Sequence, residues 1–395
     1  MSSTFIPYGR QTVSRADAEA VALSLQSHWI TQGPAVDAFE EAIAERLGAR
    51  FAVVVSSGTA ALHLACLAAG TMQGHRVITS PNSFVASSTC GIHCGADPEF
   101  VDIDTRTYNL DVGSLDAHLV DKTVERRPGV LIPVHFAGQP CDMERISEVA
   151  RCEGLATIED ACHALGATWT DRGGHARTVG DCSHSDMTVF SFHPVKHITT
   201  GEGGAVLTNN EELYHRIRAF RAHGITKSPE VLERQDEGPW YYEMQDLGFN
   251  YRMTDFQCEL GLRQLEHLSV WAERRREIAA RYDELLSNTD GVITPYQMPR
   301  TRSSYHLYPI WLAGTASGRR RKVFEAMRAA GIGVQVHYIP IHTQPYFRDR
   351  FGFKLGDYPC AESYYEGCLS LPIFPTLLDS EQDYVVSTLE KVLAK

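Results

Sequence analysis

The amino-acid sequence predicts an α/β fold in which a mostly parallel central sheet is followed by a smaller α+β domain. Short apolar runs alternate with helical patterns through the first part of the chain, which is typical of a parallel sheet whose crossovers are helices. The chain is also long for a single core at 395 residues, and this length favours two domains. We expect a large domain over residues 1–260, and a bridging helix with a small domain over residues 261–395.

Composition and charge narrow the class of protein. The chain is 43% hydrophobic and 22% charged, which is ordinary for a soluble globular protein. It carries 37 basic and 49 acidic residues, so its net charge of −12 disfavours nucleic acid or an anionic membrane as a partner. The first residues lack the pattern of a signal peptide, and no apolar run approaches the roughly 18 residues of a membrane helix. We therefore expect a cytoplasmic protein.

The ten cysteines stand at irregular spacings. Because no secretory signal is seen, reduced thiols are expected rather than a disulfide framework. Cys90 and Cys94 flank His93, but no further side chain nearby completes a tetrahedral ligand set, so no metal site is expected.

Two helices are expected before the sheet begins. The first covers residues 14–28 and starts with Ser14, a residue type that caps helix N-termini. Residues 29–34 interrupt the helical pattern. The second helix ends at Gly48 and has apolar residues at helical spacing, namely Val36, Phe39, Ile43 and Leu47.

The first strand leads into a turn that is suited to anions. Residues 51–55 form a short apolar run, residues 56–59 (Ser-Ser-Gly-Thr) a turn, and residues 60–69 a helix. A strand followed by a Gly/Ser turn and a helix N-terminus presents free backbone N–H groups to an anion. The same pattern also describes a plain strand–helix turn that binds nothing.

The strand–helix pattern repeats along the chain. Further strands are expected at residues 76–79, 99–102, 130–134, 155–158, 187–190 and 205–208. In open sheets of this kind, ligands bind beyond the carboxyl ends of the strands. The residues expected at that edge include Gly58, Thr59, Phe84, His135, Asp160 and Lys196.

The second half of the chain holds a polar segment and then the small domain. After a helix over residues 211–221, an irregular stretch over residues 223–242 continues into a tail rich in aromatic residues and Met. Such a segment suits a lid or a subunit contact. A long helix over residues 255–286 then leads into the small domain. There we expect strands at residues 305–312 and 333–337, and helices at residues 319–330 and 380–393.

The most distinctive stretch is residues 191–204, Ser-Phe-His-Pro-Val-Lys-His-Ile-Thr-Thr-Gly-Glu-Gly-Gly. It lies between two apolar strands and contains Lys196, one of only seven lysines in the chain. A lysine in a glycine-rich turn between buried strands is poorly placed for a solvated surface charge. It is well placed as a desolvated amine of the kind that forms Schiff bases. The nearby His193 and His197 are interpreted as packing or hydrogen-bonding groups of the loop.

Lys196, a carboxylate at a strand end, the anion-binding turn and the hydroxyl of Ser191 together match the needs of pyridoxal phosphate. This cofactor needs an amine for its aldehyde, a carboxylate for its pyridine nitrogen, and N–H and hydroxyl donors for its phosphate. Glu159 and Asp160 compete for the carboxylate role. Only one of them can face the cleft, because side chains alternate along a strand, and spacing does not say which. Phe84 either covers the cofactor ring or lies in the core.

Four segments together resemble the DegT-type family of nucleotide-sugar aminotransferases. They are residues 57–64 (SGTAALHL), 81–86 (PNSFVA), 158–166 (IEDACHALG) and 191–204 (SFHPVKHITTGEGG). The resemblance runs in order over almost the whole chain, and it implies the pyridoxal-phosphate-dependent transferase fold of the aspartate aminotransferase type. Within the family, the chain is most similar to the transaminases of pseudaminic acid biosynthesis, on residues 185–190, 240–245, 248–255 and 336–338.

The resemblance also implies roles for particular residues. Lys196 becomes the Schiff-base lysine and proton carrier, Asp160 the partner of the pyridine nitrogen, and His163 a neighbour of the ring hydroxyl. Phe84 covers the ring, and Asn250 reaches the phosphate of the neighbouring subunit, which implies a homodimer with shared active sites. The expected phosphate-binding residues are Gly58, Thr59, Ala60 and Ser191. The nucleotide sugar is expected near Tyr8, His28, Trp29, Ile30, Thr31, Gln335, Val336, His337 and Tyr338.

The resemblance implies transfer of the amino group of L-glutamate to C4 of a UDP-linked 4-keto-6-deoxy-N-acetylhexosamine. The product is UDP-4-amino-4,6-dideoxy-N-acetyl-β-L-altrosamine, an intermediate of pseudaminic acid biosynthesis. Some family members carry histidine in place of the lysine and dehydrate sugars, so the presence of Lys196 favours transamination. Three alternatives stay open. They are an aminotransferase for a dTDP- or GDP-linked keto sugar, a non-catalytic regulator that binds cofactor and nucleotide sugar, and a nucleotide-sugar-binding module without cofactor.

Overall fold

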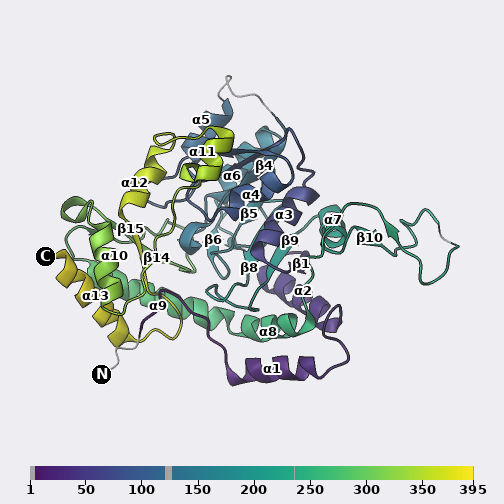
Figure 1. Ribbon diagram of the computed structural model, residues 1–395, viewed down its shortest axis with the longest axis horizontal. Coiled ribbons are helices and arrows are strands. Elements are labelled where there is room, and N and C mark those ends of the chain that lie inside the picture. Colours follow the sequence, from purple (N-terminus) through teal and green to yellow (C-terminus); the bar gives the residue numbers. More distant parts are fainter. Residues whose placement is uncertain (1–4, 121–126, 235, 395) are drawn as a thin grey trace.

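A seven-stranded sheet forms the centre of the larger part of the molecule (Figure 1). The computed structural model describes residues 5–120, 127–234 and 236–394. The strands of the sheet are β1 (Phe51–Val55), β2 (Arg76–Thr79), β3 (Asp97–Phe100), β4 (Gly129–Ile132), β5 (Ala156–Asp160), β8 (Met187–Ser191) and β9 (Gly204–Thr208). Their order is β1-β9-β8-β5-β4-β2-β3, and only β9 runs antiparallel to its neighbours. The prediction of a mostly parallel central sheet is confirmed.

The side chains of the central strands alternate between two cores. In β1, Ala52 and Val54 face one core, whereas Val53 and Val55 face the other. The helices that close the first core are α2 (Pro34–Leu47), α5 (Val112–Val120), α6 (Met143–Cys152) and α8 (Asp255–Glu266). Those that close the second are α3 (Gly58–Ala68), α4 (Ala86–His93) and α7 (Glu211–Arg221). Because both faces of the sheet are buried, its strands are continuous apolar runs rather than alternating ones.

Both predicted N-terminal helices are present, and the first starts at the cap that predicts it. Ser14 caps α1 (Arg15–Leu25), since its Oγ accepts the N–H of Asp17 at 3.1 Å and the Asp17 carboxylate accepts the N–H of Ser14 at 2.7 Å. Helix α1 ends before residue 28, because Ser27 forms a turn in which its Oγ accepts the N–H of Trp29 at 3.1 Å. Helix α2 starts on a proline and ends at Gly48, whose φ of 83° is left-handed.

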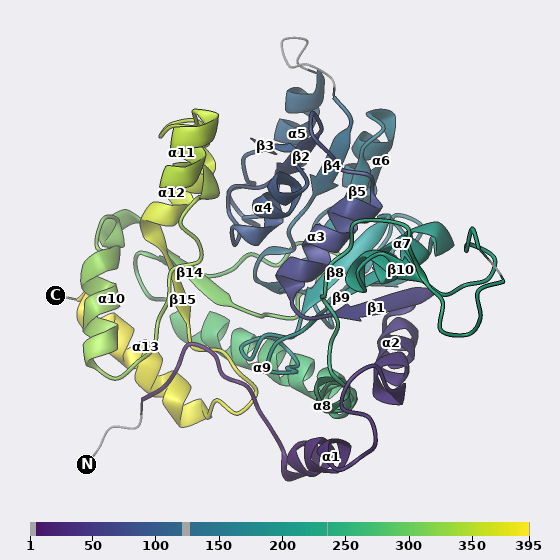
Figure 2. The same cartoon turned by 45° about the vertical axis from the view of Figure 1, so that its right-hand side comes forward.

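A second, antiparallel sheet forms the centre of the smaller part. It contains β12 (Val292–Ile293), β14 (Tyr308–Leu312) and β15 (Cys368–Leu371). Helices α9 (Leu268–Leu286), α10 (Arg320–Ala329) and α13 (Asp379–Leu393) share an apolar core with it. These helices lie together on the side of the molecule opposite β1 and α7 (Figure 2). The division at residue 260 stays a prediction, and it falls inside α8.

Two predictions about the small part need correction. The long helix predicted for residues 255–286 is two helices, because the N–H of His267 bonds to the carbonyl of Gln264 and breaks the α-helical ladder between α8 and α9. The strand predicted at residues 333–337 is wrong, since Gln335 makes only an isolated bridge to Ser370. None of the helices in the described ranges is long and apolar enough to cross a membrane.

An arm made of residues 223–234 and 236–249 extends away from the sheet, beyond α7 (Figures 1 and 2). It contains a short hairpin of β10 (Ile225–Thr226) and β11 (Glu243–Met244). Its exposed apolar side chains are Val231, Trp240, Tyr242, Met244 and Leu247. Large apolar side chains gathered on an exposed segment are typical of protein contacts.

A buried ion pair ties β1 to helices on both faces of the sheet. Glu40 of α2 and Arg221 of α7 are only 6% and 8% exposed. The Glu40 carboxylate pairs with Arg221 and accepts the N–H of Val54 at 2.9 Å, and Arg221 donates to the carbonyl of Val54 at 2.9 Å. Because β1 is an edge strand, these side chains supply hydrogen bonds that no further strand provides.

The substitution Glu40→Gln is expected to lower the free energy of unfolding by about 3 kcal/mol, because it leaves Arg221 buried without a counter-ion. Denaturant-induced unfolding followed by tryptophan fluorescence measures this change. Glu19→Gln is the control, since it breaks an exposed ion pair with Arg15 and should leave the unfolding curve unchanged. Equal effects of the two substitutions would contradict a stabilising role for the buried pair.

Candidate active site

A cavity of about 420 Å³ lies at the carboxyl ends of β5 and β8. Parallel sheets place their ligands at this edge. The residues predicted from sequence that line it are Tyr8, Gly58, Thr59, Phe84, Asp160, His163, Ser191, Lys196, His337 and Tyr338. The cavity therefore brings together residues from the N-terminal segment, the large sheet and the C-terminal part of the chain.

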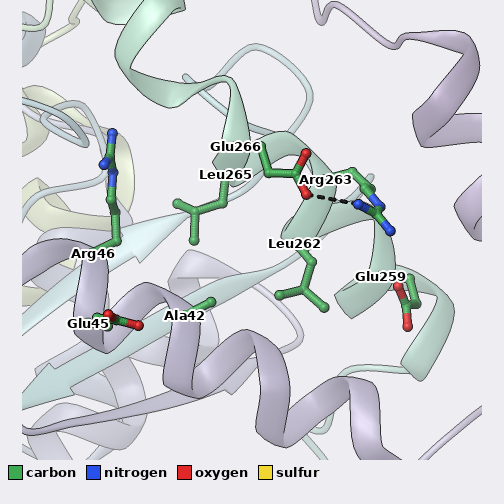
Figure 3. A pocket seen from close by; sticks show the side chains of 8 residues that line it. All are labelled: Ala42, Glu45, Arg46, Glu259, Leu262, Arg263, Leu265 and Glu266. Atoms are coloured by element: carbon green, nitrogen blue, oxygen red, sulfur yellow. Dashed lines mark hydrogen bonds and ion pairs between the residues drawn. The ribbon is translucent and has the colours of Figure 1, made fainter.

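A larger hollow of about 620 Å³ lies between α2 and α8 (Figure 3). Its charged side chains come from both helices, and Arg263 forms an ion pair with Glu266 at 2.9 Å. The floor is apolar and includes Leu262 and Leu265. No lysine, histidine, cysteine or hydroxyl side chain lines this hollow among the described residues, so it offers no amine for the aldehyde of a cofactor such as pyridoxal phosphate.

Lys196 stands in a tight loop that joins β8 to β9. Its N–H donates to the carbonyl of His193 at 2.8 Å, and its Nζ lies 3.5 Å from Nε2 of His306. Burial lowers the pKa of Lys196, whereas Cys162 and Asp160 oppose this shift. A partly buried amine with a lowered pKa is more readily available as the neutral nucleophile and base.

The glycines of this region let three segments approach one another closely. A Cβ at Gly204, the first residue of β9, would lie 2.6 Å from the backbone of Ser57. A Cβ at Gly58 would lie 2.9 Å from the Cβ of Ser191 and 3.2 Å from the Sγ of Cys162. Any larger residue at either position would therefore push apart the turn after β1 and the loop that carries the lysine.

The N-terminus of α3 points its first N–H groups toward the cavity edge formed by Gly58 and Thr59. A helix N-terminus carries partial positive charge and free donors, which suits a phosphate. Ser57 caps this helix, and its Oγ accepts the N–H of Ala60 at 3.1 Å. Ala60 itself is buried and does not line the cavity. Its N–H already donates to Ser57, so a phosphate there would have to share this donor with the Ser57 hydroxyl.

The structure separates the two acids at the end of β5. Asp160 lines the cavity, where its carboxylate accepts the hydroxyl of Ser87 at 2.6 Å and the N–H of Cys162 at 3.2 Å. Glu159 points to the opposite side of the strand and bonds to His135 at 2.7 Å. Only Asp160 can therefore meet a ligand in the cavity.

His135 does not line the cavity, although it follows a strand of the sheet. Its Nδ1 accepts the N–H of Cys141 at 2.9 Å, so its Nε2 is the nitrogen that donates to Glu159. The ring is fully buried. His135 does lie at the predicted edge of the sheet, since its N–H donates to the carbonyl of Asp160 at 3.1 Å, but the pairing with Glu159 turns its side chain away from the cavity.

Phe84, His163 and Tyr338 form an aromatic border of the cavity. Phe84 is 58% exposed, so it is not a core residue and its ring is free to cover a ligand. Burial, and then the charge of Lys196, hold the pKa of His163 well below its ordinary value. The neutral ring can thus accept the hydroxyl of Tyr338 at its Nε2, 3.1 Å away.

Several residues that the resemblance predicts for the site lie outside the cavity. Residues 28–31 and Asn250 are exposed, and none of them lines it. Residues 30 and 31 lie beside the start of α8, because Thr31 forms a bridge with Thr254 and the N–H of Asp255 donates to the carbonyl of Ile30 at 3.1 Å, whereas Asn250 forms a bridge with Ala222. Gln335 and Val336 also lie outside the cavity lining.

Other cavity residues were not predicted from sequence. They are Ser57, Leu62, Ser83, Ala86, Ser87, Val134, Cys162, His193, Val195, Glu202 and His306. Ser87 had a usable signal, because it lies one helical turn after Ser83 and Phe84 at the start of α4. His306 had none, because it lies 110 residues from Lys196 and only the fold brings the two together.

The donor set of the cavity fits pyridoxal phosphate. Lys196 offers the amine, Asp160 a carboxylate for the pyridine nitrogen, and the N-terminus of α3 with Ser191 the donors for a phosphate. The buried Nδ1 of His163 has no partner within the described ranges and is left for a ligand or water. Phe84 supplies an exposed flat ring beside these groups.

Comparisons with known proteins agree with this geometry. The sequence profile of the DegT/DnrJ/EryC1/StrS aminotransferase family matches residues 11–390. The spore coat polysaccharide biosynthesis protein SpsC of Bacillus subtilis is 38% identical over 391 residues, covering 98% of this chain and 97% of that protein. The UDP-4-amino-4,6-dideoxy-N-acetyl-β-L-altrosamine transaminase of Campylobacter jejuni is 36% identical over 391 residues, covering 99% of this chain and 98% of that protein.

Solved structures share the fold over the whole chain. PseC of Helicobacter pylori, an aminotransferase of pseudaminic acid biosynthesis, superposes with a TM-score of 0.89 at 29% identity, covering 99% of this chain and all of that one. The sugar aminotransferase Spr1654 of Streptococcus pneumoniae, in its pyridoxal phosphate form, gives a TM-score of 0.89 at 28% identity and 99% coverage of both chains. The aspartate-aminotransferase-type fold implied by the resemblance is confirmed.

After borohydride reduction of the cofactor-loaded protein, we expect the mass of the cofactor on the peptide that contains Lys196. Lys196→Ala should abolish this adduct and lower turnover by at least about a thousandfold, because both the nucleophile and the proton carrier are lost. Peptide mass spectrometry and steady-state assays measure the two effects. Lys227→Ala is the control, since Lys227 is exposed on the arm. An adduct that persists in Lys196→Ala would assign the covalent link to another residue.

Proposed function

The chain belongs to the DegT/DnrJ/EryC1/StrS aminotransferase family, and we propose that it transfers the amino group of L-glutamate to C4 of a UDP-linked 4-keto-6-deoxy-N-acetylhexosamine. The protein is a pyridoxal-phosphate-dependent aminotransferase that acts on a sugar. What we propose beyond this is that L-glutamate is the amino donor, that the sugar carries UDP, and that C4 of the sugar ring receives the amino group. The product would be UDP-4-amino-4,6-dideoxy-N-acetyl-β-L-altrosamine, which belongs to pseudaminic acid biosynthesis.

The proposal rests on an aminotransferase-type cavity in a chain similar to a known sugar transaminase. Lys196 and Asp160 share a cavity with the N-terminus of α3. The chain that builds this cavity is 36% identical, over nearly its whole length, to the altrosamine transaminase of C. jejuni. The similarity to H. pylori PseC supports the same sugar pathway at the level of fold.

The residues of the cavity suit each part of a transamination. Bound pyridoxal phosphate supplies an electrophilic carbon for amines and draws electrons from the reacting carbon. Lys196 holds the cofactor, and its Nζ, once free and neutral, takes the proton from Cα of the amino donor and later gives a proton to C4 of the sugar. Asp160 keeps the pyridine nitrogen protonated, and the N-terminus of α3 with Ser191 holds the phosphate.

Tyr8, His337 and Tyr338 are the residues of the cavity that we assign to the nucleotide sugar. The rings of Tyr8 and His337 lie 5.5 Å apart, and Tyr338 bonds to His163. They come from the N-terminal segment and from the chain after α10, whereas the expected phosphate donors Gly58 and Thr59 come from the turn after β1. Aromatic side chains with polar tips suit sugars and bases, because they offer a flat face and a hydrogen bond together.

A second relative bears on which nucleotide and sugar the protein accepts. SpsC is slightly more similar to this chain than the C. jejuni transaminase is, and its name points to spore coat polysaccharide. The names of the two relatives differ, so another nucleotide-sugar aminotransferase, acting on a dTDP- or GDP-linked 4-keto-6-deoxy sugar, is kept as the second candidate. A non-catalytic regulator is disfavoured because the matching family and the similar proteins are aminotransferases.

We further propose that two copies of the chain share their active sites. Residues 28–31 and Asn250 are expected to bind substrate and cofactor phosphate, yet they are exposed and lie outside their own cavity. The arm that precedes Asn250 is rich in exposed apolar side chains. A two-fold dimer would bury the arm and bring these residues to the cavity of the other copy.

L-Glutamate is expected to remove the visible absorption band of the bound cofactor, and the UDP-linked keto sugar should restore it with formation of the 4-amino sugar. Stopped-flow absorbance and mass spectrometry measure both half-reactions. We expect kcat/KM for the dTDP-linked analogue to be lower by at least about tenfold. Turnover of dTDP- or GDP-linked sugars alone would move the protein to the second candidate, and no response to glutamate would favour the regulator.

Lys196→Ala and Asn250→Ala homodimers are both expected to be nearly inactive, because each lacks one part of every site. When the two variants are mixed, unfolded and refolded together, about a quarter of the wild-type activity should return, since half of the dimers are mixed and each of these has one intact site. Steady-state assays of the refolded mixture measure this. A mixture as inactive as its components would contradict a shared site.

A further inference from the structure

The amine of Lys196 has a polar neighbour that has no role in the mechanism described so far. Nε2 of His306 lies 3.5 Å from Nζ of Lys196, at the limit of a hydrogen bond. His306 is only 5% exposed and lines the same cavity. Within the described ranges, no other side chain makes a hydrogen bond to this Nζ.

The backbone around His306 is held firmly in place. Arg275 of α9 is fully buried and donates to the carbonyls of Tyr305, His306 and Ile373 at 3.0–3.4 Å. The N–H of Ser304 donates to the carbonyl of Gly138 at 3.2 Å. These contacts join the loop before β14 to both parts of the molecule, so the imidazole of His306 is presented to Lys196 by a fixed support.

The groups around this pair decide its protonation. Asp160 and Cys162 face Lys196, and the side chains facing His306 besides Lys196 are His163, His197 and Arg275, with His337 also close to the lysine. Burial, and then the positive charge of Lys196, hold the pKa of His306 well below its ordinary value. His306 is therefore neutral near pH 7 and keeps a lone pair on one ring nitrogen.

A lysine that carries a proton between two carbons must be able to hold that proton as an ammonium group. An ammonium group has only donors, so a buried one needs acceptors nearby. Burial works against the charged form of Lys196. The neutral Nε2 of His306 is placed to accept an N–H from Nζ and so to favour the charged form.

We propose that His306 is a further catalytic residue, which accepts a hydrogen bond from the protonated amine of Lys196 and so stabilises the ammonium form in which the lysine holds the transferred proton. This inference rests on the proposed role of Lys196 as proton carrier. It involves no transfer to the ring, because the proton stays on Nζ. Removing the acceptor should therefore lower the pKa of Lys196.

The test compares His306→Phe, which keeps a flat ring without an acceptor, with His306→Gln, whose side-chain carbonyl can still accept. The pKa of Lys196 is measured in the cofactor-free protein, as the pH dependence of its acylation rate followed by peptide mass spectrometry. We expect His306→Phe to lower this pKa by about one pH unit, and His306→Gln to stay close to the wild type. If the phenylalanine ring does not fit, His306→Leu gives the same comparison.

His215→Phe is the control, because His215 on α7 is exposed and does not line the cavity, and it should leave the pKa unchanged. In the loaded enzyme, the low-pH limit of the reaction with glutamate should shift in the same direction as in the cofactor-free protein. A pKa unchanged in His306→Phe, or lowered equally in His306→Gln, would overturn the role of His306. Neither result depends on which sugar the enzyme accepts. A wrong substrate assignment would show only in the turnover assays, not in the pKa of Lys196.

Discussion

The site depends on one constraint, which is that the amine of Lys196 must be kept largely out of water while polar groups still surround it. The loop between β8 and β9 achieves the burial, because Gly58 and Gly204 let the turn after β1 pack directly against it. The same close approach places the N-terminus of α3 beside Ser191. A single arrangement of the turn after β1, the loop between β8 and β9 and the N-terminus of α3 therefore buries the lysine and places donors for a phosphate beside it.

Both parts of the molecule contribute to that arrangement. The large sheet supplies Lys196 and Asp160, whereas His306 and Tyr338 come from the C-terminal part of the chain. Arg275 on α9 holds the loop of His306, which links the bridging helices to the lysine. The electrostatics follow from the same geometry, because burial and the charge of Lys196 keep the surrounding imidazoles neutral and able to accept hydrogen bonds.

The parallel sheet and its ligand-binding edge could be predicted from sequence, because strands alternate with helices along the chain. Lys196 could also be predicted, because the residues that mark it lie within one short segment of sequence. The choice between Glu159 and Asp160 could not be made from spacing, because it depends on which face of β5 each acid occupies and on the pairing of Glu159 with His135. His306 could not be found either, because tertiary packing alone brings it to the lysine. The break at His267 was missed because apolar spacing continues from α8 into α9.

The central claim is that Lys196 and Asp160 hold one pyridoxal phosphate between them. A crystal structure of the protein with its cofactor tests this most directly. The account predicts continuous density from Nζ of Lys196 to the cofactor, the ring nitrogen within hydrogen-bond distance of Asp160, and the phosphate at the N-terminus of α3. A cofactor bound in another orientation, with its ring nitrogen away from Asp160 or its phosphate away from Gly58 and Thr59, would contradict it.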